Sequence, residues 1–472
     1  MTPSGTAGAI EDSIGQWREY LRRRGALRPA DVEELEGHLR DQIAALQSAG
    51  LAADEAFLVA TKRMGAQDAI ANEFAREHSE RLWKQLIAAP DGAGAAARAA
   101  ARREALVVFG LAAAAALAVK VPALFGFAMG PGDQEALFYF RNASLFVFPL
   151  LTLYFVWKRG LHWRTCWWLA VPFAAAAVVV NGLPVCAIAP CRPFFPFAPG
   201  ANTEPLVALH LPIALWLAVG IAYAGGRWSE SAARMNFIRF SGELFIYYAL
   251  MALGGGVLVL FTMAIFKAIG VNAGWLVGEW VLPCGALGAV IVGAWLVEAK
   301  QSVIENMAPV LTRLFTPLFA ATLIVFLATM AWTGRGIDIE REFLIAFDLL
   351  LAVVLGLLLY SISARDPGAP RGPFDFLLVA LVVSALIADG GALAAVAARI
   401  SELGFTPNRV AALGENVVLL VNLAWSAWLY AGFLRGRGTF AAVERWQTAY
   451  LPVYAAWAAI VVVVFPPVFG FA

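Results

Sequence analysis

Apolar stretches of membrane-spanning length dominate the chain after residue 104. A transmembrane helix needs about 20 predominantly apolar residues, and eleven segments approach that length. Their approximate bounds are 105–129, 136–157, 166–183, 206–224, 244–266, 275–297, 314–332, 343–360, 376–396, 417–434 and 450–469. Because lipid offers the backbone no hydrogen-bond partner, such segments cross a bilayer as helices. We therefore predict an all-α protein in which residues 104–472 form a polytopic transmembrane bundle of about 11 spans.

The charged residues divide the chain into two parts of different character. Residues 1–103 contain 14 Lys and Arg and 15 Asp and Glu, a proportion typical of soluble proteins, whereas residues 104–472 contain only 21 and 19. This contrast predicts a small water-soluble domain before the bundle. It excludes a soluble enzyme, a secreted disulfide scaffold and a disordered regulator. The net charge is only +1, so we expect no nucleic acid partner.

Helical periodicity is clear in the first part of the chain. One apolar stripe at helical spacing consists of Val32, Leu35, Leu39, Ile43 and Leu46. We therefore predict a helical domain over residues 1–88 and a linker over residues 89–103. The first 25 residues contain no apolar signal segment, so this domain is expected to remain in the cytoplasm.

The stretch from residue 32 to residue 77, VEELEGHLRDQIAALQSAGLAADEAFLVATKRMGAQDAIANEFARE, resembles a known helical module. Its acidic helix, its Gly50-Leu51 turn followed by Glu55-Ala56, and its Met64-Gly65 step are similar to the bacterial permease prefix domain. The resemblance covers roughly residues 11–85. In that family the domain precedes polytopic membrane proteins, including permease subunits. The resemblance implies a cytoplasmic regulatory module that binds a protein partner, and it implies no catalysis.

Positive charge in the loops predicts the orientation of the bundle. With the N-terminus inside, the loops after even-numbered spans contain 13 Lys and Arg, and the opposite side contains 7 when Arg141, near the start of the second span, is counted with its loops. The positive-inside rule requires an excess of this sign. Eleven spans then leave the C-terminus outside. We predict a multi-pass protein of the bacterial inner membrane with a cytoplasmic N-terminus and a periplasmic C-terminus.

Two cysteines, Cys186 and Cys191, share one predicted outer loop. In an oxidising periplasm they can form a disulfide, and the alternative is that both remain unpaired. No cysteine or histidine recurs at the spacing of zinc ligands. We therefore expect neither a metal site nor a cofactor.

Ionisable side chains inside the predicted spans are the first candidates for function, because charge at membrane depth is costly. These candidates are Glu279, Asp348, Glu243, Asp389 and Lys120. A buried carboxylate among them can bind a proton or a cation. The alternative is structural: each group pairs with a neighbouring Lys or Arg, or lies at a wet interface.

A second group of polar residues surrounds the start of the tenth span. It consists of Thr406, Asn408, Arg409, Glu415, Asn416 and Asn422. Thr406 is expected to cap a helix that Pro407 opens. The segment from Gly404 to Arg409, with residues 419–423 after it, is similar to a motif of an uncharacterised family of bacterial polytopic membrane proteins. This resemblance implies a membrane fold and no activity.

Three functions are compatible with these features. The intramembrane carboxylates favour a permease-like transporter that is regulated by its N-terminal domain. A non-transporting signalling or scaffold protein would instead bind partners through that domain and through an amphipathic helix near residues 303–311. An intramembrane enzyme is disfavoured, because the sequence contains no nucleophile-elbow, zinc-peptidase, P-loop or dinucleotide motif. The lipid bilayer is the partner that the composition itself predicts.

Overall fold

The computed structural model describes residues 11, 14–15, 18, 29–48, 51–63, 95–127, 133–182, 202–268, 270–299, 308–333, 341–366 and 368–470. Every regular element within these ranges is a helix, as the sequence predicts. The chain divides into two units, Met1–Glu104 and Ala105–Ala472. The predicted disulfide partners Cys186 and Cys191, and most of the predicted amphipathic helix near residue 303, lie outside the described residues.

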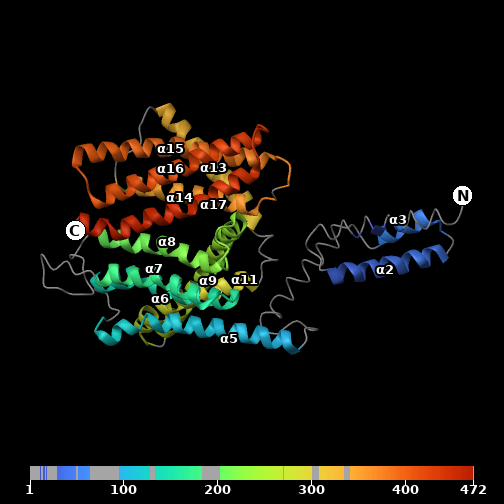
Figure 1. Cartoon of the computed structure of the whole chain (residues 1–472), viewed down its shortest axis with the longest axis horizontal. Coiled ribbons are helices and arrows are strands. Elements are labelled where there is room, and N and C mark those ends of the chain that lie inside the picture. The colour runs from blue at the N-terminus through green and yellow to red at the C-terminus, as the bar shows by residue number, and fades with distance from the viewer. Residues whose placement is uncertain are drawn as a thin grey trace. The chain divides into compact units, whose positions relative to one another are not determined.

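In the first unit, α2 (Pro29–Ser48) packs against α3 (Ala53–Arg63) (Figure 1). The predicted stripe is confirmed where side chains are described, since Leu39, Ile43 and Leu46 are all buried. They form a small core with Ala56 and Ala60, which lie one turn apart on α3. The first unit therefore has its own hydrophobic core.

The second unit is a helical bundle. Its long helices are α5 (Ala95–Ala118), which belongs to this unit from Ala105 on, α6 (Asp133–Arg159), α7 (Trp163–Gly182), α8 (Thr203–Tyr223), α9 (Ser231–Ala268), α11 (Leu282–Ala299), α13 (Ala308–Thr333), α14 (Arg341–Ala364), α15 (Pro373–Leu403), α16 (Pro407–Leu434) and α17 (Phe440–Val463). Shorter helical turns are η1 (Val121–Phe125), α10 (Gly274–Leu276), η2 (Val277–Val281) and α18 (Phe465–Val468). Among the described residues, eleven helical segments are long and apolar enough to cross a membrane. This number matches the prediction and fits a multi-pass membrane protein.

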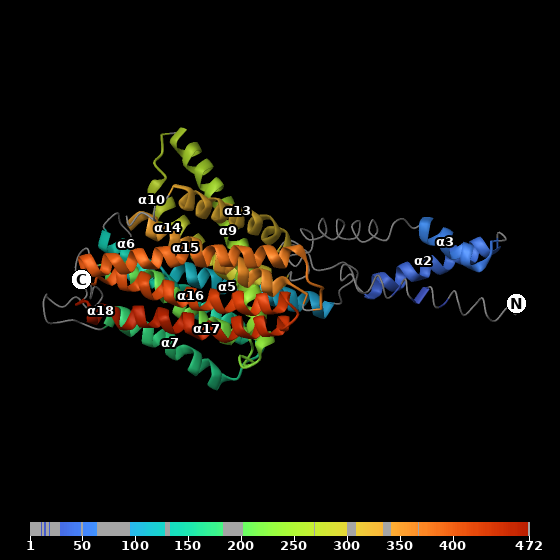
Figure 2. The same cartoon turned by 90° about the horizontal axis from the view of Figure 1, so that it is seen from above.

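Three spans begin clearly before their predicted starts: the fifth, the tenth, where α16 begins at Pro407 instead of residue 417, and the last. The fifth was expected to begin at residue 244, but α9 begins at Ser231 and has 38 residues, about 57 Å of helix. Apolarity alone misses this start, because a helix satisfies its own backbone and can continue through polar residues such as Arg239. The last part of α9 is mostly exposed and stands away from the other helices (Figure 2).

The last span also lies earlier than predicted. It was expected over residues 450–469, whereas α17 ends at Val463 and Pro466-Pro467 form the separate turn α18. Proline cannot donate the backbone hydrogen bond that a helix interior needs. At its other end α17 includes Gln447 and Thr448, which are polar but completely buried. Their burial explains why a hydropathy pattern does not detect this part of the helix.

The hydrophobic core of the bundle consists of two main clusters of side chains. One is built from α5, α6, α7, α8, α9 and α11 with Val462 of α17, and the other from α9, α13, α14, α15, α16 and α17. The two groups of helices are visible in Figure 1, where α8 lies next to α17. Helix α9 contributes to both clusters, with Phe237 and Phe240 in the first and Met235 and Ile238 in the second. The first half of α9 therefore joins the two groups.

Gly242 allows α14 to approach this central part of α9. A Cβ atom at residue 242 would lie 2.7 Å from Cδ2 and 2.9 Å from Cε2 of the Tyr360 ring, and the Tyr360 side chain is itself buried. Any larger residue must displace the ring or the helix. Gly254, later in the same helix, has no such neighbour within 4 Å.

We predict that Gly242→Val destabilises the purified protein and Gly254→Val does not. Overpacking a core costs about 1–3 kcal/mol, and both variants place the same side chain in the same helix. The measurement is the midpoint of thermal unfolding in detergent. Equal midpoints for the two variants would contradict the close approach of α9 and α14.

Candidate functional site

Three packed helices of the bundle bring four of the predicted polar residues together. Asp348 lies on α14, Asp389 on α15, and Glu415 and Asn416 lie side by side on α16. These three helices pack against one another. The charge of Asp348 acts on Asp389, the charge of Glu415 acts on Asp348, and the Asn416 amide lies beside Asp348. We refer to these four residues as the carboxylate cluster.

The carboxylate cluster contains polar atoms that the protein leaves without partners. Asp389 and Asn416 are completely buried. Neither oxygen of the Asp389 carboxylate has a hydrogen-bond partner, and the same holds for Oδ1 of Asp348. Buried polar groups are hydrogen bonded in the great majority of cases, and an unpaired buried charge is costly. The carboxylates of the cluster therefore need a proton or a positively charged ligand to neutralise their charge.

The surroundings of the carboxylate cluster are apolar. Ala392 and Val396, one and two turns after Asp389, are buried in a small core that Phe347 and Leu413 cover. Phe347 precedes Asp348 in the chain, and its ring packs against Phe326 at 5.5 Å between centroids. Asp389 is the seventeenth of the 31 residues of α15, so it lies near the middle of its helix. Low-dielectric surroundings of this kind strengthen every electrostatic interaction in the cluster.

The remaining intramembrane candidates lie elsewhere. Glu243 is buried on α9 and lines a separate cavity near the start of that helix. Glu279 lies in the π-helical turn η2 and is exposed at the protein surface. Lys120 donates to the backbone carbonyl of Glu279, and its ammonium group lies 4.4 Å from the centre of the Trp280 ring. Lys120 and Glu279 thus connect the ends of neighbouring helices and do not join the carboxylate cluster.

The polar group around the start of α16 separates into distinct contacts. Thr406 caps α16 by accepting a hydrogen bond from the Arg409 backbone amide, as predicted. The Arg409 side chain donates to the Gly404 carbonyl at 2.8 Å, and Asn408 donates to Asn202 at 3.2 Å. Sixteen residues of helix separate Thr406 from Asn422, a distance of about 24 Å. Only Glu415 and Asn416 of this group therefore belong to the carboxylate cluster.

Asn422 belongs to a buried network between α16 and α17 whose other members were not predicted. Its amide donates to Gln447 at 3.2 Å, and Gln447 donates to Ser426 at 2.6 Å. The Ser426 hydroxyl in turn donates to the Asn422 carbonyl at 2.6 Å. All three side chains are buried, and their mutual hydrogen bonds indicate a structural role.

A buried ion pair, also not predicted, connects α6 to α8. The Arg141 guanidinium donates to the Glu204 carboxylate, and the two side chains are 0% and 7% exposed. Arg141 also donates to Asn181 of α7 at 3.3 Å, while Asn181 and Asn142 exchange hydrogen bonds of 2.7 and 3.0 Å. An arginine inside an apolar span is a signal for such a pair, but the sequence does not reveal which acid completes it.

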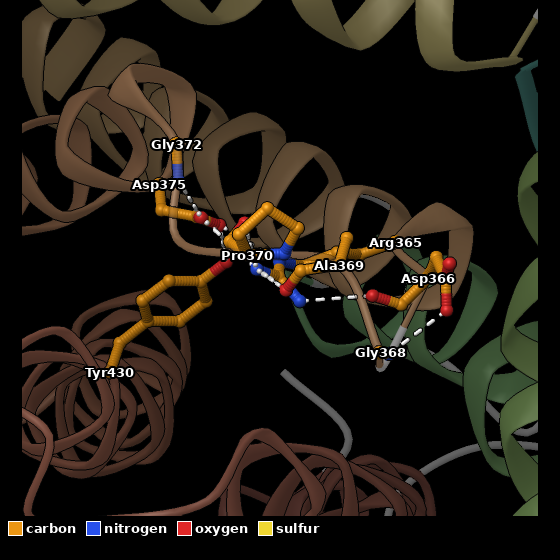
Figure 3. A network of polar contacts seen from close by, with 8 residues as sticks. All are labelled: Arg365, Asp366, Gly368, Ala369, Pro370, Gly372, Asp375 and Tyr430. Atoms are coloured by element: carbon orange, nitrogen blue, oxygen red, sulfur yellow. Dashed lines mark hydrogen bonds and ion pairs between the residues drawn. The ribbon is translucent and has the colours of Figure 1, made fainter.

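A further network holds the loop between α14 and α15 (Figure 3). Arg365 donates to both carboxylate oxygens of Asp375, at 3.0 and 3.2 Å, and Asp375 also accepts from the Tyr430 hydroxyl at 2.8 Å. The same guanidinium donates to the carbonyls of Ala369 and Pro370, both at 3.1 Å. Every oxygen of this carboxylate is satisfied, in contrast to Asp389.

Among the described residues, no group of three His, Cys, Asp or Glu side chains is arranged to hold a metal ion. The carboxylate cluster lies in apolar surroundings. Its chemistry suits a proton or a monovalent cation better than a tightly held divalent metal, which takes six or more oxygen ligands.

We predict that Glu204→Gln strongly destabilises the protein, because it leaves the buried guanidinium of Arg141 without its counter-charge. Breaking a buried pair in this way costs about 3–5 kcal/mol. The double variant Arg141→Met with Glu204→Gln removes both charges and should recover much of the loss. The thermal midpoint in detergent measures both effects. A single variant as stable as the wild type would show that the ion pair does not hold α6 to α8.

No family model, curated protein or solved structure matches the chain. The resemblances of residues 11–85 to the permease prefix domain and of the α16 segment to a bacterial membrane-protein family therefore stay predictions. A fold alone does not determine function, which depends on the chemistry of the individual sites.

Proposed function

We propose that the chain is a permease-like transporter whose carboxylate cluster binds a proton or a monovalent cation during transport. The observation that carries the proposal is the Asp389 carboxylate, which is completely buried and has no partner for either oxygen. Among the carboxylates that the structure describes, only Asp389 and Asp348 have buried oxygens without partners.

The electrostatics of the cluster support a cycle of binding and release. Two negative charges placed close together in apolar surroundings repel each other and lack solvation, so at least one must be neutralised. A proton or a cation supplies that neutralisation, and its departure makes the packing of α14, α15 and α16 less favourable. A ligand that changes the relative stability of two helix arrangements is what coupled transport requires.

A purely structural role is less consistent with the contacts. Buried polar groups that fasten helices satisfy each other, as Arg141 with Glu204 and Gln447 with Ser426 do. Asp389 lies where α14, α15 and α16 meet, and its carboxylate has no such partner. Intramembrane acids of this kind are typical of proton and ion pathways.

We further propose that the first unit regulates the transporter by binding a cytoplasmic protein, and that the membrane is the bacterial inner membrane. The separate core around Leu39 and Ala60 supports an independent module. Its surface carries an exposed charge network, in which Arg40 binds Glu11 at 2.5 Å and Glu36 at 2.9 Å. The hydrogen bond from Arg40 is the largest of the effects that lower the pKa of Glu11.

The test uses the full-length protein in vesicles. We expect infrared difference spectra between about pH 5 and pH 8 to show a protonated carboxyl band from the apolar cluster that is absent from Asp389→Asn. The exposed carboxyl of Asp41 gives a matched control, because Asp41→Asn makes the same chemical change outside the bundle.

Transport itself is tested by solute-induced currents across the same vesicles, screened over ions and metabolites. We expect a solute that gives a current with wild type and Asp41→Asn, and a current at least about tenfold smaller with Asp389→Asn, since an uncharged amide cannot exchange a proton. Unchanged spectra and an absence of current in every variant would reject the proposal and favour the non-transporting scaffold.

A further inference from the structure

A polar cavity of about 560 Å³ opens between the end of α6, the end of α8 and the first half of α9. Its charged lining residues are Arg159, Arg227, Arg239 and Glu243. All four lie toward the end of the bundle that the loop charges assign to the cytoplasm. Small-molecule sites commonly occupy about 300–1,000 Å³, so the cavity has room for a metabolite-sized group.

The lining carries an excess of positive charge. Three guanidinium groups come from three different segments and are opposed within the lining by one carboxylate, Glu243. Glu298 lies nearby and pairs with Arg159 at 2.9 Å and with Lys158 at 3.6 Å. Arg227 has an ion pair with Glu230 at 3.8 Å, but both side chains are more than half exposed, and such surface pairs are weak. An incoming anion can therefore compete for Arg227.

Two of the arginines are held in place by backbone carbonyls. Nε of Arg159 donates to the Tyr223 carbonyl at 3.1 Å, and its guanidinium lies 5.1 Å from the centre of the Tyr223 ring. Nε of Arg239 donates to the Ser363 carbonyl of α14, also at 3.1 Å. These bonds fix the orientation of the guanidinium groups before any ligand arrives. Preorganised arginines lose little entropy when they bind an oxyanion.

The other residues that line the cavity also suit an oxyanion. Asn236 is exposed at the cavity and offers an amide that can donate a hydrogen bond, and the aromatic rings of Tyr223 and Phe240 form apolar wall. Planar guanidinium groups bind phosphate and carboxylate oxygens in pairs, with short charge-assisted hydrogen bonds. A ligand with such oxygens complements the three guanidinium groups of the lining.

We propose that this cavity binds an anion that carries a phosphate or carboxylate group. The anion is either a free solute from the cytoplasmic side or the headgroup of an anionic lipid. The site uses α6, α8 and α9, whereas the carboxylate cluster uses α14, α15 and α16. The proposal thus does not depend on the proposed transport mechanism.

Arg227→Gln and Asn236→Asp test the site with little risk to the fold, because both residues are exposed. The probe is inorganic phosphate added to full-length protein in an uncharged detergent, with chloride at the same ionic strength as the reference. We expect phosphate to raise the thermal midpoint of the wild type. In both variants the phosphate concentration for half of this effect should increase about tenfold, because a charge-assisted contact is lost or opposed.

Arg437→Gln is the matched control, since Arg437 is exposed in the loop before α17 and does not line the cavity. It should respond to phosphate as the wild type does. If the anion is a lipid headgroup, the probe is phosphatidylglycerol mixed with phosphatidylcholine in nanodiscs. Native mass spectra should then show phosphatidylglycerol bound to the wild type and to the control, and absent from the two cavity variants. If neither phosphate nor phosphatidylglycerol distinguishes the cavity variants from the control, the proposal is wrong.

Discussion

Charged side chains that lie between apolar helices must find partners inside the protein, because lipid provides none. The Arg141–Glu204 pair meets this requirement and connects α6 to α8. Asp375 meets it at the loop between α14 and α15, where Arg365, Tyr430 and the Gly372 amide use both carboxylate oxygens. These satisfied groups hold the helices in place. Asp389 differs from them, because neither oxygen of its buried carboxylate has a partner.

The two proposed sites lie in different groups of helices but share a mechanical connection. Arg239 lines the cavity on α9 and donates to the Ser363 carbonyl near the end of α14. The same helix carries Asp348 fifteen residues earlier, about 22 Å along its axis. Gly242 lets Tyr360 pack closely between these positions. A shift of α14 on proton or cation binding would therefore change the position of the Ser363 carbonyl to which Arg239 donates. Coupling between the two sites in this way requires that α14 has two arrangements.

The number of spans and the candidate acids followed from the sequence, because hydrophobic length and rare intramembrane charge are local properties. Thr406 as a helix cap was predictable for the same reason. Pairing is not local. Arg141 and Glu204 are 63 residues apart, and no pattern along the chain identifies them as partners. The starts of α9 and α17 were also missed, since hydropathy cannot distinguish a polar residue in a loop from Gln447, which is buried and hydrogen bonded within a helix.

Because the sequence does not show which residues are neighbours in space, the five intramembrane candidates were expected together but lie at different sites. Glu279 and Asp389 are equivalent in sequence terms, as each is an acid within an apolar run. Glu279 lies in a π-helical turn on the exposed surface, whereas Asp389 is completely buried between packed helices, where the charge of Asp348 acts on it. The cost of an ionised carboxylate depends on what surrounds it and not on the residue type. What each acid in this bundle can do therefore depends on its surroundings. Some acids are exposed, some pair with arginine, and some lie near another acid.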